Sequence, residues 1–124
     1  MKFTTIVVLL STLASPILAE GDAKSGAKVF KKCKACHAVG DDAKNRVGPA
    51  LNGIVGSPAA ENPNFKYSKG MVAAAEEGLI WDTDSLTSFL TKPRDFIKGT
   101  KMSFAGLRKQ SEIDDVIAYL ETFN

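Results

Sequence analysis

The only two cysteines and the only histidine of this 124-residue chain fall within five consecutive positions. The segment reads Cys33-Lys34-Ala35-Cys36-His37, so the thiols are three residues apart and the imidazole follows directly. A zinc site needs more ligands of these types than the chain contains. Chemistry that joins sulfur and imidazole in this protein must therefore be centred on this one segment.

Three kinds of site use two cysteines at this spacing. In an exported protein the pair can form a disulfide, and a thioredoxin-type redox pair sits in a βαβ context that is missing here. The pattern Cys-x-x-Cys-His is the attachment site of c-type haem. Because residues three apart at a helix end share one face, both thiols can reach the vinyl groups of one porphyrin. The sequence therefore predicts one haem c bound through Cys33 and Cys36, with His37 as an iron ligand.

Because the chain has no other histidine, Met71 and Met102 are the candidates for a second iron ligand. A polar turn over residues 97–101 precedes Met102 and can bend back over a flat ligand. Met71 falls in a short amphipathic segment, where methionine more often fills a core. These features favour Met102. Met71 and an open coordination position remain the alternatives.

The first 19 residues have the pattern of a cleaved export signal. A positively charged start leads into an apolar run over residues 6–13, and Pro16 and Ala19 supply the helix break and the small residue of a cleavage site. The run is too short to span a bilayer comfortably, and no second apolar segment follows. We expect a signal peptide at residues 1–19, one domain at residues 20–124 and a periplasmic location. The alternative is an uncleaved membrane anchor.

The charge balance limits the kinds of partner. Residues 1–19 hold one lysine and no acid, so 15 basic and 14 acidic side chains remain without them. A chain so nearly neutral does not have the excess of positive charge typical of nucleic-acid-binding proteins. We therefore expect no nucleic-acid partner.

The middle of the chain predicts a long loop. Residues 38–66 are rich in Gly, Pro, Asn and Asp, and a loop of about 28 residues is unusual inside a compact domain. A domain of about 105 residues also has a marginal core. A large apolar cofactor that packs against the loop would account for both features.

Four segments have helical periodicity and none predicts a strand, so the fold class is all-α. Asp22 and Ser68 are the predicted N-caps of the first two helices. Ser111 and Asp114 form a predicted capping box at the start of the last one. The predicted helices span residues 23–34, 69–76, 83–91 and 112–122.

With these features in place, the chain resembles the class I cytochromes c, in particular mitochondrial cytochrome c and bacterial cytochrome c2, over residues 21–121. The resemblance implies a compact all-α fold of four to five short helices and long loops wrapped around one covalently bound haem. A longer stretch between Ser68 and Gly78 places the chain nearer the bacterial branch. The matching positions are Gly26, Phe30, Cys33–His37, Gly48–Leu51, Phe65–Tyr67, Leu79–Trp81, Pro93, Gly99–Gly106 and Ile117–Leu120.

The resemblance also implies a role for several residues around the haem. The Pro49 carbonyl accepts the Nδ1–H of His37, and Met102 is the second axial ligand. Tyr67 and Trp81 donate hydrogen bonds to a haem propionate. The remaining implied positions are Thr100 as a further propionate donor, Leu51, Leu86, Phe89, Phe104 and Leu120 as walls of the haem site, and Gly26 and Phe30 packed against Val116 and Tyr119.

Two positions depart from the family pattern. Ser57 stands where many members have an arginine near the propionates, and loss of that cation is expected to lower the reduction potential because ferric haem is the more positive state. Phe89 stands where many members have a tyrosine close to the methionine sulfur, and loss of that hydroxyl is expected to alter the Met–iron bond.

The function implied by the resemblance is single-electron transfer, not catalysis, because His/Met ligation leaves no open position for a substrate. A haem enzyme or gas binder with an open position and a haem-free thiol–disulfide protein are the alternatives. The expected partners are membrane redox complexes such as quinol–cytochrome c reductase and a terminal oxidase or photosynthetic reaction centre. We expect a monomer without stable membrane insertion. The cations expected around the exposed haem edge are Lys31, Lys32, Lys34, Lys92, Lys98, Lys101, Arg108 and Lys109.

Overall fold

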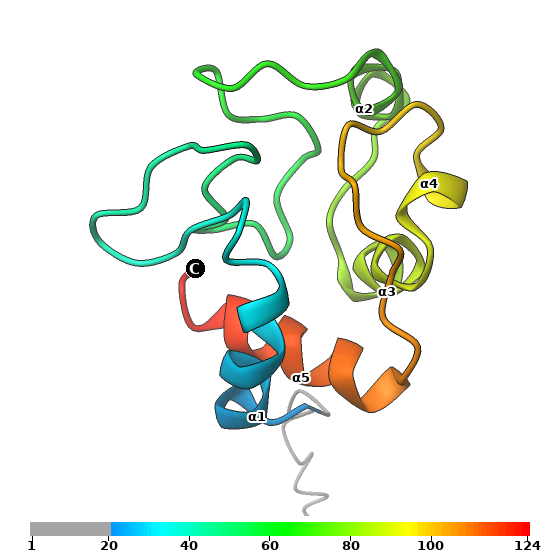
Figure 1. Ribbon diagram of the computed structural model, residues 1–124. Helices are drawn as coiled ribbons and strands as arrows, with labels where there is room; N and C mark the ends of the chain where they lie inside the picture. The colour runs from blue at the N-terminus through cyan, green and yellow to red at the C-terminus, as the bar shows by residue number, and fades with distance from the viewer. Residues whose placement is uncertain (1–20) are drawn as a thin grey trace, which may run out of the picture.

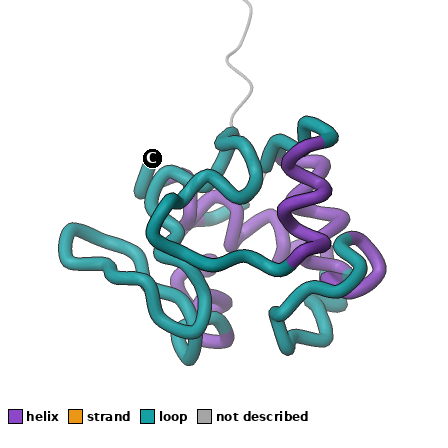
Figure 2. The backbone as a smooth tube through the Cα atoms, turned by 90° about the horizontal axis from the view of Figure 1, so that it is seen from above, coloured by secondary structure: helices purple, strands orange, loops and turns teal. Residues whose placement is uncertain are grey.

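Residues 21–124 are described by the computed structural model, so the predicted signal peptide at residues 1–19 lies outside the described residues. Within them, short helices are joined by long loops, and Figure 2 shows how much of the backbone is loop. Their sole β-type pairing is an isolated bridge between Pro58 and Ile80. The all-α prediction is confirmed. The elements are α1 (Ala23–Val29), a 3₁₀ turn η1 (Phe30–Lys32), α2 (Lys69–Glu76), α3 (Thr83–Thr91), α4 (Pro93–Phe96) and α5 (Gln110–Glu121).

Helices α1 and α5, from opposite ends of the chain, cross in contact at the base of Figure 1. Gly26 permits the close approach, since a Cβ atom at this position would collide with the Asp115 carbonyl and lie 2.7 Å from Cβ of Tyr119. The rings of Phe30 and Tyr119 pack with their centroids 5.4 Å apart. The expected packing of the first helix against the last is therefore confirmed.

Helices α2 and α3 have the bounds that the sequence predicts. The Ser68 hydroxyl accepts the Met71 N–H at 3.1 Å and caps α2, and Gly78 ends the segment with a φ of +91° that favours glycine. Asp82 caps α3 by accepting the Ser85 N–H at 2.8 Å. These two helices are predictable because local side-chain caps fix their ends.

The first helix differs from the prediction at its C-terminal end, and the last helix differs at both ends. Asp22 caps α1 as expected, but the α-helix ends at Val29 and the chain tightens into η1, where the Cys33 N–H binds the Phe30 carbonyl at 2.8 Å. Helix α5 begins at Gln110 with Lys109 as N-cap.

The predicted capping box at the start of α5 is wrong. No side chain caps the helix at Lys109. The Asp114 carboxylate accepts the side-chain amide of Gln110 at 2.8 Å instead of completing a box with Ser111. The helix therefore starts two residues earlier than predicted, with a side-chain pair at i and i+4 in its first turn.

The predicted end of α3 before Pro93 is correct, but a fourth short helix follows at once. Pro93 occupies the first turn of α4, where its missing N–H costs nothing. Helix α4 brings Phe96 within 6.3 Å of the rings of both Trp81 and Phe89. A single turn of helix has too short a pattern to be detected from sequence periodicity.

The elements surround the centre of the molecule on three sides. In Figure 1 the loop segment 38–66 lies on the left, α2, α3 and α4 on the right, and the crossed α1 and α5 below. Residues 38–66 contain no helix, as predicted. None of the helices within residues 21–124 has the length and hydrophobicity of a transmembrane segment.

Candidate functional site

A cavity of about 560 Å³ occupies the space between the loops and the helices. Its lining comes from nearly the whole described chain, from Phe30 to Leu120. Every residue that the sequence placed in the site lies on its wall, so the fold brings together positions that are widely separated in sequence. These residues are Cys33, Cys36, His37, Pro49, Tyr67, Trp81, Thr100, Met102 and Phe104.

The attachment segment forms a turn at the edge of the cavity. The Cys36 and His37 N–H groups both bind the Cys33 carbonyl, at 3.1 and 2.9 Å. The two thiols are free and half-buried, not joined as a disulfide, and burial raises the pKa of the Cys33 thiol. Two unpaired sulfur atoms and one imidazole therefore face the same space.

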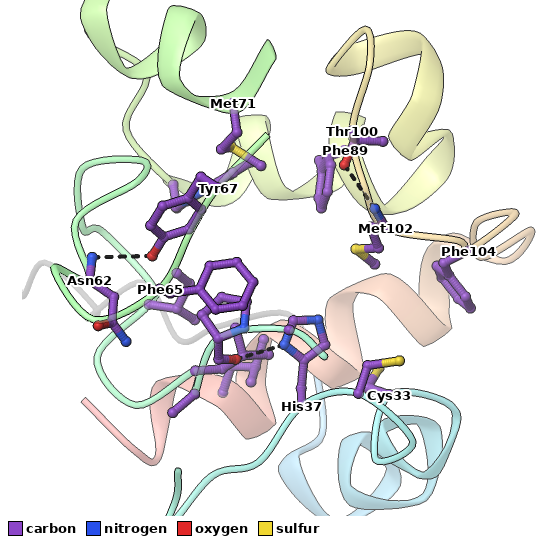
Figure 3. A pocket seen from close by; sticks show the side chains of 18 of the residues that line it. Cys33, His37, Asn62, Phe65, Tyr67, Met71, Phe89, Thr100, Met102 and Phe104 are labelled. Atoms are coloured by element: carbon purple, nitrogen blue, oxygen red, sulfur yellow. Dashed lines mark hydrogen bonds between the residues drawn. The ribbon is translucent and has the colours of Figure 1, made fainter. Parts of the chain in front are cut away.

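A backbone carbonyl fixes the orientation of His37. The Nδ1–H donates to the Pro49 carbonyl at 2.8 Å, which leaves Nε2 as the unprotonated nitrogen. Burial lowers the pKa of His37, and the hydrogen bond to Pro49 partly opposes this change. In Figure 3 the ring projects into the cavity. A neutral, oriented imidazole with a free Nε2 is the form that binds a metal.

Met102 projects into the cavity from the wall opposite His37 (Figure 3). Its N–H donates to the hydroxyl of Thr100 at 3.3 Å, which shapes the turn that carries it. Met71 packs against the core, as its helical setting predicts, but it also lines the cavity. Figure 3 places the Met71 side chain beside Tyr67 and away from His37.

Several polar side chains on the wall are held by neighbours. The Tyr67 hydroxyl accepts the Asn62 N–H at 3.1 Å (Figure 3), so its own proton remains to be donated. Trp81 lines the cavity and is 5% exposed. The hydroxyl of Ser57, one of the two departures from the family pattern, donates to the backbone carbonyl of Ile54 at 2.8 Å.

The rest of the wall is mostly apolar, and the five residues expected there all line it. Phe65 and Asn62 are among the lining residues to which no role was assigned from the sequence. Phe65 stacks edge to face on Tyr67 with ring centroids 4.9 Å apart, and Asn62 contributes an amide. The spacing of Phe65 and Tyr67 was a usable signal for the first, whereas no periodicity marks Asn62. The confirmed wall residues are Leu51, Leu86, Phe89, Phe104 and Leu120.

The cavity has the features that a flat, iron-bearing macrocycle needs. Its donors are two thiols, one imidazole nitrogen and one thioether, a soft set that suits iron in haem and not a hard cation. Residues 21–124 contain no cluster of three or more His, Cys, Asp or Glu side chains for another metal. A Cβ atom at Gly48 would lie 2.7 Å from Nδ1 of His37. Glycine is therefore required where the imidazole packs against the loop.

Comparisons with known proteins agree with this reading of the site. The family model described as cytochrome c matches residues 23–124. Cytochrome c2 of Afifella marina is 51% identical over 100 residues, which are 81% of each chain. Cytochrome c2 of Agrobacterium tumefaciens (strain II Chrys) is 50% identical over 101 residues, which are 82% of this chain and 91% of that one.

Solved structures show the same likeness. The structure of cytochrome c2 from Rhodospirillum centenum has a TM-score of 0.80 at 42% identity, covering 84% of this chain and 99% of that one. Cytochrome cH from Methylobacterium extorquens has a TM-score of 0.74 at 42% identity, covering 82% and 99%. The chain belongs to the cytochrome c family, a haem electron carrier and not an enzyme, with one haem c attached through Cys33 and Cys36.

Proposed function

We propose that this protein is an exported, periplasmic carrier that moves single electrons between membrane redox complexes, with its haem iron held by His37 and Met102. The observation that carries the proposal is the placement of these two side chains on opposite walls of one cavity (Figure 3). When bound there, haem supplies a one-electron iron couple, and the thioether ligand favours Fe(II) and raises its potential.

The protein residues hold this arrangement in place. The Pro49 carbonyl fixes the tautomer of His37, and Thr100 supports the backbone of Met102. Tyr67, Trp81 and Thr100 are the proposed donors to the propionates. Apolar side chains along the wall exclude water from the site. Because the same ligands serve both oxidation states, little reorganisation opposes the transfer of an electron.

With His37 and Met102 both bound to the iron, no coordination position would remain for a substrate or gas. This supports outer-sphere electron transfer and disfavours the alternative of a haem enzyme or gas binder. The proposed domain boundaries are a cleaved signal peptide at residues 1–19 and the cytochrome domain at residues 20–124. The proposed form in solution is a monomer.

The proposed docking surface is the set of cations expected around the haem edge, all of which are exposed. Lys32 and Lys101 also line the mouth of the cavity. Lys32 forms an ion pair with Glu112 at 3.3 Å, and the ammonium group of Lys101 donates to the Lys66 carbonyl at 3.4 Å. Such a surface would attract acidic patches on quinol–cytochrome c reductase and on a terminal oxidase or photosynthetic reaction centre.

Optical spectra of the purified holoprotein, together with its kinetics on membranes of the source, test the proposal. We expect low-spin, six-coordinate haem with a far-red sulfur-to-iron band in the ferric form, reduction by quinol-supplied membranes and oxidation by the terminal complex. High-spin, five-coordinate iron would overturn the ligand assignment. A low-spin protein that no membrane complex reduces or oxidises would overturn the role as a shuttle.

A further inference from the structure

Two asparagine side chains join two stretches of loop, 43–50 and 60–67, that lie beside the cavity. The side-chain oxygen of Asn45 accepts two hydrogen bonds, from the Ala50 N–H at 2.9 Å and from the side-chain amide of Asn62 at 2.9 Å. The side-chain oxygen of Asn62 accepts the Asn64 N–H at 3.0 Å, and the backbone N–H of Asn62 donates to the Tyr67 hydroxyl at 3.1 Å. One network therefore spans both loops.

The direction of each hydrogen bond is fixed by the backbone. The Ala50 N–H can only donate, so the atom of Asn45 that it meets must be the oxygen. The Asn64 N–H fixes the oxygen of Asn62 in the same way. The amide nitrogen of Asn62 is thus left to donate to Asn45. The pair has one orientation, with Asn45 accepting and Asn62 donating.

The network acts on the imidazole of His37 through a single peptide group. The Pro49 carbonyl and the Ala50 N–H belong to the same planar unit. The carbonyl end meets Nδ1 of His37 at 2.8 Å, and the N–H end meets the side-chain oxygen of Asn45 at 2.9 Å. Holding one end of a rigid plane fixes the direction of the other end, so Asn45 sets where the carbonyl points.

The same network directs the hydroxyl of Tyr67. Because the oxygen already accepts from the Asn62 N–H, the remaining direction for its proton lies away from that N–H, and Tyr67 lines the cavity. Asn45 and Asn62 are both partly buried. Neither loop contains a helix, and the sole isolated bridge of the described chain lies outside 43–50 and 60–67. Side-chain hydrogen bonds therefore hold these loops together in place of a helix or a sheet.

We propose that Asn45 and Asn62 are positioning residues for the redox centre. Their amide pair holds the Pro49 carbonyl against His37 and turns the Tyr67 proton toward the cavity. This inference deepens the proposed function and rests on it, since it assigns to His37 and Tyr67 the roles proposed above.

The test is hydrogen exchange in the reduced, ¹⁵N-labelled holoprotein, followed by NMR at the Ala50 N–H and at the Nδ1–H of His37. Asn45→Ala removes the acceptor. We expect exchange at both protons to become about three- to tenfold faster, the factor that corresponds to the loss of one hydrogen bond. The amide of Val116, in the buried middle of α5, reports on global opening and should keep its rate.

Two isosteric variants test the direction of the pair. Asn45→Asp keeps an acceptor for both donors, so the two protons should retain their wild-type protection. Asn62→Asp keeps the acceptor for the Asn64 N–H but sets an oxygen against the oxygen of Asn45, so protection at Ala50 and His37 should fall as in Asn45→Ala. Asn64→Ala is the control, since Asn64 contributes only its backbone N–H to the network.

Equal protection in Asn45→Asp and Asn62→Asp would overturn the proposal. So would a rise in exchange at Val116 by the same factor as at Ala50, which indicates a general loss of stability. If Asn45→Ala yields no holoprotein, the two aspartate variants decide the matter alone. Failure of the proposed function is separate: the wild-type holoprotein itself would then lack the low-spin spectrum of His/Met ligation.

Discussion

Gly48 lies against the face of the His37 imidazole so closely that no side chain fits between them. A Cβ atom at position 48 would lie 2.7 Å from Nδ1 and 2.8 Å from Nε2 of the ring. The Gly48 N–H is itself bound to the Cys36 carbonyl at 2.9 Å, so the backbone has little freedom to move away. The loop is therefore fitted to the imidazole.

Gly48→Ala should consequently displace the ring. We expect a loss of about 1–3 kcal/mol in the free energy of unfolding, the usual cost of overpacking, and a weaker far-red band in the ferric holoprotein. Gly40→Ala is the control, because nothing lies within 4 Å of a Cβ there and only the positive φ of +106° is strained. A Gly48→Ala protein with the wild-type spectrum and stability would contradict the close fit.

Cys33→Ala and Cys36→Ala should each yield little holoprotein, because each removes one thioether anchor and the chain has no other cysteine. The measurement is covalent haem per mass of purified protein, read from a denaturing gel stained for haem and from the intact mass. Normal accumulation of covalently loaded protein in both variants would refute the attachment through these thiols.

Met102→Ala should open a coordination position, lower the reduction potential and introduce peroxidase-like activity. Met71→Ala should do none of these, since its side chain lies beside Tyr67 and away from His37 (Figure 3). The far-red band of the ferric protein distinguishes the two variants. Survival of the band in Met102→Ala and its loss in Met71→Ala would reverse the ligand assignment.

The stabilisation that Asp82 gives to α3 should be lost at acid pH. Its carboxylate accepts the backbone N–H and the hydroxyl of Ser85, which holds its pKa below the ordinary value of 3.8. A lowered pKa means that the stabilisation is complete above 3.8 and is lost as the pH falls through the folded-state value. The difference in unfolding free energy between wild type and Asp82→Ala should therefore shrink below that pH.

Asp82→Asn provides the matched comparison for this titration. The amide still accepts at the N-cap but carries no charge, so its advantage over Asp82→Ala should not vary between pH 3 and pH 7, about the range in which carboxylates titrate. Denaturant unfolding across that range measures both differences. A wild-type advantage that stays constant down to the lowest pH would show that the charge of Asp82 is irrelevant to the cap.

Electron transfer to the membrane partner should slow steeply as ionic strength rises. Without residues 1–19 the chain has 15 basic and 14 acidic side chains, a net charge of only +1, so a strong dependence must come from a local group of cations. Lys34→Glu and Lys101→Glu should slow the second-order rate more than Lys24→Glu, which lies at the start of α1. Screening acts over roughly 8–10 Å at physiological salt.

Lys32→Glu should also slow transfer more than Lys24→Glu, but it breaks the ion pair with Glu112 as well, so Lys34 and Lys101 give the cleaner comparison. Rate constants over a salt series for each variant provide the measurement. A flat series, or equal slowing by Lys24→Glu and Lys101→Glu, would remove the docking surface and leave the haem assignment intact.

The sequence predicted those parts of the fold that local signals determine. Ser68 and the apolar spacing of Leu86, Phe89 and Leu90 define α2 and α3, and both helices have the expected bounds. The predicted start of α5 was wrong because Asp114 pairs with the side chain of Gln110. A capping-box pattern does not predict that pair. The single turn of α4 has no periodicity to detect.

The part of the site that depends on rare residue types could be predicted from the sequence. Cys33, Cys36 and His37 can be recognised from their residue types and their spacing. The family resemblance extended the prediction to the cavity wall. The amides of Asn45 and Asn62 were not predictable. They meet across 17 positions of irregular loop, and only the folded path of that loop brings them together.

The crossing of α1 and α5 determines when the protein can finish folding. A contact between the two ends of a chain closes the longest loop available. Such contacts form slowly because the chain loses the entropy of closure before the contact gives any stabilisation. During synthesis, α1 and the thiols that follow it appear well before α5 exists. The chain therefore passes through a period in which its cysteines are accessible, and this period ends when α5 supplies Ile113, Val116 and Leu120 to the core against which Cys33 packs.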